Sequence, residues 1–282
     1  MSVKISVITI CYNAADVIRT TIESVLAQDY DDYEYIIQDG NSSDETPDIV
    51  NEYSPKFAEK GIRLVYVREP DGGIYDAMNR AMASAEGRYI NYMNAGDCFY
   101  SAGVLAHIAK TADDSDGASP VIIYGDCAVY EYGRFYLFAK SLENIYESMP
   151  FSHQSVFASS EFLRAHPFNC SYRYSADYDF LLTAKDLDVK FADSGTVVCI
   201  TTADGTSSIN YHDTLMESAE ILKAHGRYAH SDAELKKTEK VLSLKQFVLD
   251  HFPVAVRKWI RGVQIKKRGQ SFEAAVPPWF II

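Results

Sequence analysis

Polar and apolar residues alternate along the first hundred positions in blocks that predict strands and helices in turn. Four short apolar runs rich in β-branched residues are typical of strands buried on both faces, and they lie at 3–10, 33–38, 64–68 and 88–93. Between them, apolar residues recur at helical spacing over 13–28, 46–57 and 74–85. This alternation predicts an α/β fold with a doubly wound, mostly parallel sheet.

The pattern is less regular beyond residue 100. It predicts helices near 102–111, 176–187 and 212–224, and strands near 120–130, 134–140 and 189–199. We expect one α/β domain over 1–225, with a first half over 1–100 and a second half over 101–225, followed by a helical extension over 226–282.

Polar residues gather directly after each of the four predicted strands of the first half. They occupy positions 11–13, 39–41, 71–73 and 94–97. In an open α/β sheet, ligands bind in the crevice at the carboxyl ends of the strands. Four such loops in succession therefore predict a binding site at this edge.

Asp39 is a strong candidate in these loops because it follows a buried strand and precedes Gly40, which lets the chain turn. Its carboxylate can accept the imide N–H of uracil or thymine, or the N–H edge of guanine. An Asx-type turn that caps the next helix is the alternative. That alternative suits Asp44 better than Asp39, so we expect Asp39 to point into the crevice.

Charge and cysteine content narrow the class of protein. The formal net charge of −12 argues against nucleic acid as a partner. Residues 1–250 have a net charge of −17, whereas 251–282 have +5. The five cysteines are dispersed, which predicts neither a disulfide framework nor a zinc site. Without a signal-peptide pattern or an apolar run of about 18 residues, we expect a cytoplasmic protein, at most peripheral on the cytoplasmic face of a membrane.

Four segments in this order make the chain resemble family 2 glycosyltransferases: ITICYNAADVIRTTIESVLAQ, IIQDGNSSDET, EPDGGIYDAMNRAMASAEGRYI and NAGD. The resemblance is strong over 3–100 and weaker as far as about 210. It implies a GT-A fold in which 1–100 is the nucleotide-binding half and 101–225 the acceptor half. It also implies the inverting transfer of a sugar from a nucleotide-sugar donor, with UDP preferred, to a hydroxyl of a glycan or lipid-linked glycan.

The same resemblance implies a donor site in the first half of the chain. The base would lie over Tyr12, and Asp39 would read its edge. Gly72 and Gly73 allow close approach of the backbone. The residues expected to contact the donor are Thr9, Tyr12, Asn13, Asp39, Gly73, Asp76, Asn79, Arg80, Asn94 and Ala95.

A metal site is implied at 93–97, where the family usually has an Asp-x-Asp type motif. This chain keeps Asp97 but has Asn94 and Gly96 where acids are common. One carboxylate, two donor phosphates and water are a sufficient ligand set for Mn²⁺ or Mg²⁺. We therefore expect Asp97 to bind the metal.

Asp177 matches the second acidic motif of the family, and the resemblance implies that it is the general base. The alternative for Asp177 and Asp179 is that both are helix N-terminal acids stabilised by the helix dipole. His153 and Gln154 match an element ahead of the base and are expected on the acceptor side or at the donor sugar; a structural role for His153 stays open. Residues 205–207 and His212 are weaker candidates for the donor phosphates.

The segment 252–268 is basic and amphipathic and contains Trp259. It is suited either to an anionic membrane surface or to packing on the domain or on a second subunit, so an oligomer stays open. A non-catalytic sugar-nucleotide-binding protein is the competing class, because the acidic motif is depleted. A nucleotidyltransferase and a nicotinamide oxidoreductase do not fit, because the loop at 11–15 lacks the glycine-rich phosphate motif of either class.

Overall fold

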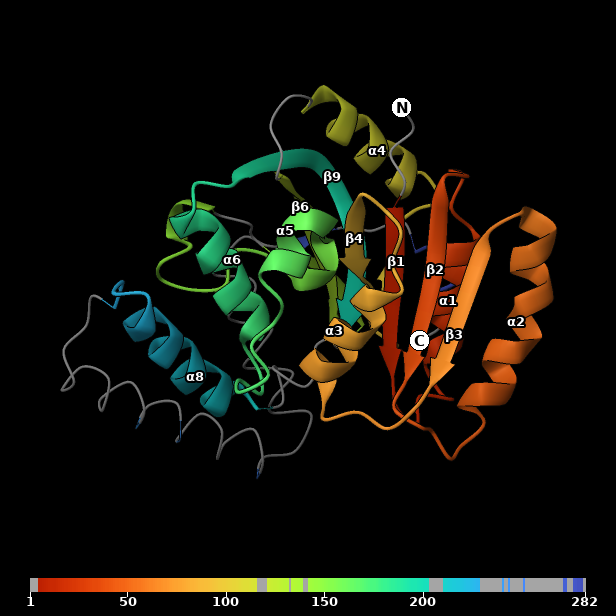
Figure 1. Cartoon of the computed structure of the whole chain (residues 1–282), viewed down its shortest axis with the longest axis horizontal. Coiled ribbons are helices and arrows are strands. Elements are labelled where there is room, and N and C mark those ends of the chain that lie inside the picture. The colour runs from red at the N-terminus through yellow and green to blue at the C-terminus, as the bar shows by residue number, and fades with distance from the viewer. Residues whose placement is uncertain are drawn as a thin grey trace.

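The structure is a computed structural model that describes residues 5–115, 121–131, 133–138, 142–202, 210–228, 240, 243, 251, 271–272 and 276–280. One continuous sheet runs through it, in the order β10-β7-β6-β8-β4-β1-β2-β3, and β9 pairs with β6 and β5. Figure 1 shows α3 in front of β4 and β1, and α1 behind β2 and β3. The predicted α/β class is therefore confirmed.

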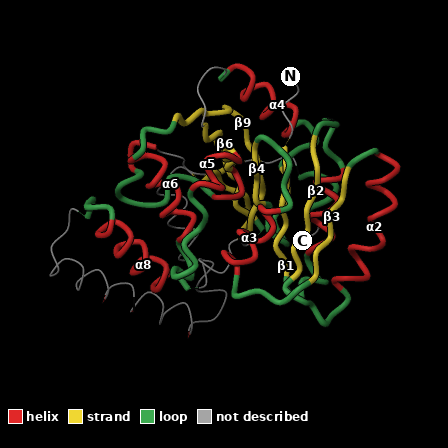
Figure 2. The backbone as a smooth tube through the Cα atoms, viewed as in Figure 1, coloured by secondary structure: helices red, strands yellow, loops and turns green. Residues whose placement is uncertain are grey.

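The first half contains the four parallel strands that the pattern predicts. These elements are β1 (Ile5–Cys11), α1 (Ile18–Leu26), β2 (Tyr33–Asp39), α2 (Thr46–Lys60), β3 (Arg63–Arg68), α3 (Ile74–Ala83) and β4 (Tyr89–Tyr92). β1 lies between β2 and β4, and β3 follows β2, all in parallel register. Because all four strands run the same way, their carboxyl ends meet at one edge, where Figure 2 shows the connecting loops at the bottom of the view.

Helix α1 begins at Ile18 and not at residue 13 as predicted. Asn13 has a φ of 47°, outside the helical region. The N–H groups of Ala14 and Ala15 donate to the Thr46 Oγ1 and Asp44 Oδ2 atoms. These bonds hold residues 13–15 as a loop against the start of α2, which the apolar periodicity does not show.

The second half adds shorter elements and reverses some strands. They are β5 (Cys98–Phe99), α4 (Val104–Asp114), β6 (Val121–Glu131), β7 (Arg134–Phe138), the 3-10 turns η1 (Leu142–Asn144) and η2 (His153–Ser155), β8 (Val156–Ser159), α5 (Ser160–Ala165), α6 (Ala176–Asp186), β9 (Lys190–Thr202), α8 (Tyr211–Ala224) and β10 (Ser271–Phe272). β8 runs antiparallel to β4 and β6, whereas β9 runs parallel to β6. The sequence pattern did not predict β5, β8, α5 or β10.

Among the described residues, the two larger apolar cores lie on opposite faces of the sheet. Residues of α1, α2 and α4 pack in one, and residues of α3, α5, α6 and α8 pack in the other. Within the described part of the chain, no helix is long and apolar enough to cross a membrane.

A histidine joins α8 to α6, the helix that begins with the candidate base. His225 contacts Asp179 through Nε2 at 3.0 Å and Asp186 through Nδ1 at 2.8 Å. Arg227 donates a further bond of 2.8 Å to Asp186. Burial alone would lower the pKa of His225, but its bonds to the two carboxylates raise it above its usual value.

We expect His225→Gln to lower the free energy of unfolding by about 1 kcal/mol at pH 6 and by less at pH 8.5. A histidine with a raised folded pKa contributes stability that is complete below its unfolded pKa of about 6.5 and is lost as the pH rises through the folded pKa. Urea unfolding at both pH values tests this. Arg227→Gln is the control, because arginine does not titrate in this range. An equal cost of His225→Gln at both pH values would contradict the charged form.

Candidate active site

The loops after β1, β2 and β3 form one wall of the crevice. The Tyr12 ring is exposed over 66% of its surface. A Cβ atom built on Gly40 would lie 2.7 Å from Asp71 Oδ2 and 3.4 Å from Tyr12 Cδ2. A larger residue at position 40 would therefore require the Asp71 carboxylate to move. An exposed aromatic ring beside a flat stretch of backbone is suited to stacking a nucleobase.

Asp39 is fully buried, and both of its oxygens have partners. Oδ1 accepts from the Ser42 N–H at 2.8 Å and the Ser42 hydroxyl at 2.6 Å. Oδ2 accepts from the Tyr66 hydroxyl at 2.7 Å. These contacts form a local turn and a link to β3, so Asp39 can read a base only if one of these partners is displaced. The base-reading role of Asp39 stays a prediction.

Thr9 and Asn13 hold the loops of this wall in place. The fully buried Thr9 hydroxyl donates to the Met93 carbonyl at 2.7 Å and lies 2.8 Å from the Tyr35 hydroxyl. Asn13 Oδ1 accepts from the Ser43 N–H at 2.8 Å. In this structure, Thr9 supports the crevice from inside the sheet, whereas the Asn13 loop borders it.

The segment that leads into α3 is held by its own carboxylates. Gly73 has a φ of 120°, which favours glycine, and its N–H donates to Asp71 Oδ1 at 2.9 Å. Asp76 Oδ2 accepts from the Gly72 N–H and from Arg80 Nε, each at 2.8 Å. Arg80 also lies 3.3 Å from Glu69. The guanidinium is therefore paired with two acids, although 43% of its side chain is exposed towards a ligand or solvent.

Asn79 does not share the partners of Asp76, although helical spacing predicts that the two residues can face one side. Asn79 Nδ2 donates to the Phe168 carbonyl at 2.8 Å, and Oδ1 accepts from the Phe168 N–H at 3.0 Å. Both ends of the amide hold the segment before α6. A donor contact of Asn79 would require these bonds to break, and it stays a prediction.

The Asp97 loop is bonded to η2. Ala95 donates its N–H to the Ile10 carbonyl at 3.2 Å, which extends the contact between β1 and β4. Gln154 Nε2 donates to Asp97 Oδ2 at 2.6 Å. Burial raises the pKa of Asp97 to about 6, although the Gln154 bond and the nearby His153 act in the opposite direction.

The donor atoms near Asp97 fit a partial coordination shell for a hard cation. Among the described residues, no group of three or more His, Cys, Asp or Glu side chains could hold a metal ion. The Asn94 Oδ1 atom is buried and has no hydrogen-bond partner among them. An unpaired amide oxygen and a buried carboxylate are the oxygen ligands that Mg²⁺ and Mn²⁺ accept, and donor phosphates and water would complete the shell.

Asp177 is the second residue of α6, and several hydrogen-bond donors contact its carboxylate. Its Oδ1 atom accepts from the Tyr75 hydroxyl at 3.1 Å and from the Tyr178 N–H at 3.0 Å. Its Oδ2 atom lies 3.2 Å from His153 Nδ1. The side chains of Asp177 and His153 are 16% and 26% exposed, so the pair is only partly open to a ligand.

His153 connects the candidate base to the candidate metal loop. Its Nε2 atom lies 3.1 Å from Asn94 Nδ2, while Nδ1 contacts Asp177. Burial alone would lower the pKa of His153, but the contact with Asp177 raises it above its usual value. These contacts favour a role of His153 in orienting Asp177, and its predicted place on the acceptor side or at the donor sugar stays a prediction.

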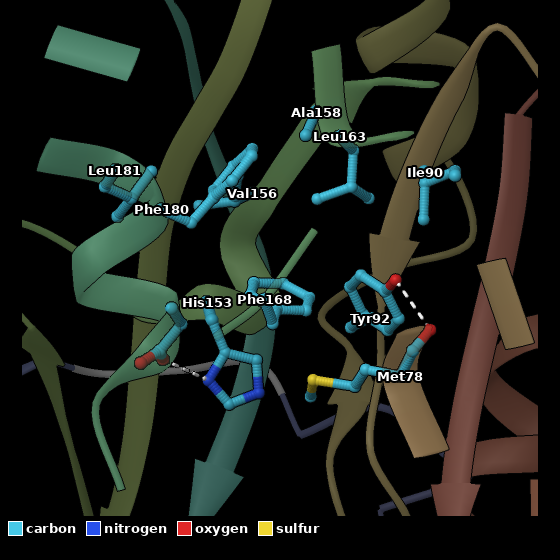
Figure 3. A pocket seen from close by; sticks show the side chains of 11 residues that line it. Met78, Ile90, Tyr92, His153, Val156, Ala158, Leu163, Phe168, Phe180 and Leu181 are labelled. Atoms are coloured by element: carbon cyan, nitrogen blue, oxygen red, sulfur yellow. Dashed lines mark hydrogen bonds and ion pairs between the residues drawn. The ribbon is translucent and has the colours of Figure 1, made fainter. Parts of the chain in front are cut away.

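A small apolar cavity of about 30 Å³ lies beside this pair. Figure 3 shows the His153 ring at one end of a pocket whose labelled lining is otherwise almost wholly apolar, including Met78, Phe168 and Leu181. On this side, the Asp177–His153 pair therefore borders mostly apolar surroundings.

Two residues of the site were missed from the sequence. Tyr75 was not singled out from the sequence as a site residue; its ring is buried, and its hydroxyl contacts Asp177. Asp71 was seen only as part of a polar loop, although its position after the third strand was the available signal. Of the weaker candidates, His212 has a buried Nε2 atom without a partner among the described residues. Residues 205–207 lie outside the described residues.

Comparisons with known proteins show that this chain is a glycosyltransferase with the GT-A fold. A family model described as glycosyl transferase family 2 matches residues 6–181, and the chain therefore belongs to that family. A PGL/p-HBAD biosynthesis glycosyltransferase of Mycobacterium tuberculosis is 32% identical over 176 residues, which cover 62% of this chain and 67% of the relative. A putative teichuronic acid biosynthesis glycosyltransferase, TuaG of Bacillus subtilis, is 42% identical over 93 residues, which cover 33% of this chain and 36% of TuaG.

Solved structures show the same fold at lower identity. The mannosyltransferase PcManGT of Pyrobaculum calidifontis, in complex with GDP-Man and Mn²⁺, has a TM-score of 0.62 at 17% identity and covers 95% of this chain and 81% of that chain. S. aureus TarS 1-349 in complex with UDP has a TM-score of 0.59 at 20% identity, and covers 77% of this chain and 65% of that chain.

Proposed function

We propose that this glycosyltransferase moves a sugar from a UDP-sugar to a hydroxyl group of a glycan or lipid-linked glycan, with inversion at the anomeric carbon. Asp177 is the general base, and Asp97 binds Mn²⁺ or Mg²⁺. The chain of contacts from Asp177 through His153 to Asn94 of the Asp97 loop is the observation that carries this proposal. It brings a candidate base and a candidate metal ligand to one side of the crevice.

The nucleotide half of the proposal uses the wall formed by Tyr12, Gly40 and Asp71. The base stacks on the exposed Tyr12 ring while the backbone at Gly40 allows close approach. TarS has been crystallised with UDP, which supports uridine, and PcManGT with GDP-Man, which supports guanosine. Asp71 favours guanine, because guanine offers two N–H groups to a carboxylate and uracil offers one. Guanosine is therefore the alternative that the test must include.

In the proposed reaction, the acceptor oxygen attacks the anomeric carbon while the bond from that carbon to the diphosphate oxygen breaks. Asp177 takes the proton of the acceptor hydroxyl. His153, Tyr75 and the Tyr178 N–H hold the carboxylate in place and supply hydrogen bonds to its charged form. When bound at Asp97, the cation supplies Lewis-acid stabilisation of the departing diphosphate.

The division into halves at residue 100 and the extension over 226–282 remain proposals, as does peripheral attachment at the cytoplasmic face of a membrane. The basic segment 252–268 that would contact such a membrane lies outside the described residues. The acceptor class rests on the names of relatives that act in PGL/p-HBAD and teichuronic acid biosynthesis.

Isothermal titration with UDP, GDP and dTDP, each with and without Mn²⁺, tests the donor class. We expect one nucleotide to bind at least tenfold more tightly with Mn²⁺, and Asp97→Ala to abolish that difference, because the substitution removes the carboxylate that binds the cation. Glu52→Ala is a suitable control, since it changes an acid of α2 that is 49% exposed and pairs with Arg19 and Lys56. Binding that is indifferent to Mn²⁺ and to Asp97 would favour the non-catalytic class instead.

A further inference from the structure

The segment 276–280 lies about 180 residues beyond the metal loop in sequence and yet packs directly behind it. The Trp279 indole N–H donates to the Phe99 carbonyl at 2.9 Å, within the buried part of the protein. Phe99 is only two residues from Asp97. Trp279 and Phe280 are 9% and 7% exposed. Trp279 lies outside the residues that the family model matches, whereas Phe99 lies within them.

The segment belongs to a small core of its own. Trp279 and Phe280 pack with Cys98, Ala128 and Ile200. The Phe280 ring also lies 5.3 Å from the Tyr130 ring and 5.7 Å from the Phe135 ring, measured between centroids. Strands β5, β6, β7 and β9 all contribute to this cluster, so the segment joins the strand after Asp97 to the strands of the second half.

The Asp97 loop is also held by hydrogen bonds from α1. The Thr21 hydroxyl donates to the Asp97 carbonyl at 2.7 Å and accepts from the Gly96 N–H at 2.9 Å. The Phe99 N–H donates to the Ser24 hydroxyl at 3.2 Å. The backbone of Phe99 is therefore held by α1 at its N–H group and by Trp279 at its carbonyl group.

We propose that Trp279 is a positioning residue for the Asp97 loop. Strand β5 pairs with β9, and the Tyr100 N–H donates to the Val198 carbonyl, but the donor to the Phe99 carbonyl is the Trp279 indole. A buried carbonyl that loses its donor has a desolvation cost. Without the indole N–H, residues 97–100 open more often, and Asp97 is presented less consistently to the cation and the donor phosphates. The part of this inference that concerns donor binding rests on the proposed function.

Trp279→Phe tests the proposal, because it removes the N–H group and keeps an aromatic ring. We expect the amides of 97–100 to exchange hydrogen about tenfold faster than in the wild type. We also expect the affinity for nucleotide with Mn²⁺ to fall at least threefold, while the affinity without Mn²⁺ stays unchanged. Phe280→Leu disturbs packing in the same cluster without removing the hydrogen bond, and Val276→Ala changes an exposed position of the same segment.

Both controls should change each quantity less than twofold. Unaltered exchange at 97–100 in Trp279→Phe would overturn the proposal, and so would a Phe280→Leu variant that reproduces both effects in full. If the wild type shows no Mn²⁺-dependent nucleotide binding, the proposed function fails, and the exchange measurement alone still decides whether Trp279 holds the loop. Melting temperatures of all variants ensure that binding is compared between folded proteins.

Discussion

Asp177→Asn is expected to lower kcat about 10²–10⁴-fold while nucleotide binding stays within about threefold of the wild type. Asparagine has nearly the volume of aspartate and can still accept hydrogen bonds from Tyr75 and the Tyr178 N–H. It cannot take the proton of the acceptor hydroxyl. The loss therefore falls on the chemical step and not on the proposed base-stacking wall, which lies on the loops after β1 to β3.

Steady-state turnover with a labelled donor, combined with nucleotide titration, measures both quantities. Asp179→Asn is the matched control: Asp179 lies in the same first turn of α6, but its carboxylate contacts His225. If the residues were only helix N-terminal acids, the two variants would lose similar, small amounts of activity. A kcat of Asp177→Asn within tenfold of the wild type would remove Asp177 from the role of base.

The His153 contacts give this prediction a further consequence. Because His153 lies between Asp177 and Asn94, a change at the base also alters the partner of the histidine beside the metal loop. Gln154, the next residue, contacts Asp97 itself. The turn η2, which lies directly before β8, therefore places two adjacent side chains against Asp177 and Asp97.

The first half of the fold was predictable because its strands are buried on both faces and its helices are amphipathic, so composition and spacing agree. The second half was harder. β5 has two residues and β8 has four, which is too short for a periodic signal. Trp279 shows the same limit. The sequence around it is apolar, but only the folded structure shows that the Trp279 indole N–H donates to the Phe99 carbonyl.

The loops that border the candidate site were predictable from the sequence, whereas the hydrogen-bond partners of individual side chains were not. Asp97, His153 and Asp177 come together as expected for one crevice, since each follows or precedes a recognisable element. The hydrogen bond from the Tyr66 hydroxyl to Asp39 depends on the pairing of β2 with β3. The hydrogen bond from Asn79 to the Phe168 carbonyl joins residues that are 89 positions apart. Such long-range partners leave no mark in local sequence.

The end of the sheet opposite the crevice contains a buried carboxylate that sets the spacing of the parallel strands. Glu34 is fully buried in β2. Its Oε1 atom accepts from the Ser6 hydroxyl of β1 and from the Glu86 N–H before β4, each at 2.6 Å. Its Oε2 atom pairs with Arg63 of β3. One side chain thus ties together all four strands on which the crevice is built.

Glu34→Gln is expected to lower the free energy of unfolding at pH 7 by about 3 kcal/mol, because it leaves Arg63 facing an amide and removes a buried charge from three donors. For a chain of this size that corresponds to a melting temperature lower by roughly 6–12 °C. Glu86→Gln is the control, since Glu86 lies 3.6 Å from the same Arg63 but is 59% exposed, and its loss should cost less than about 1 kcal/mol.

The cost of Glu34→Gln should also depend on pH. Burial alone would raise the pKa of Glu34, but the bonds from Ser6 and the Glu86 N–H, together with Arg63, hold it below its usual value. A carboxyl with a lowered folded pKa contributes stability that is complete above its unfolded pKa of about 4.3 and is lost as the pH falls through the folded pKa. Denaturant unfolding at pH 7 and pH 4 should therefore show a smaller difference between wild type and variant at pH 4. A difference that stays constant would mean that Glu34 acts by shape and hydrogen bonding alone, and that the charge on this carboxylate does not hold the four strands in register.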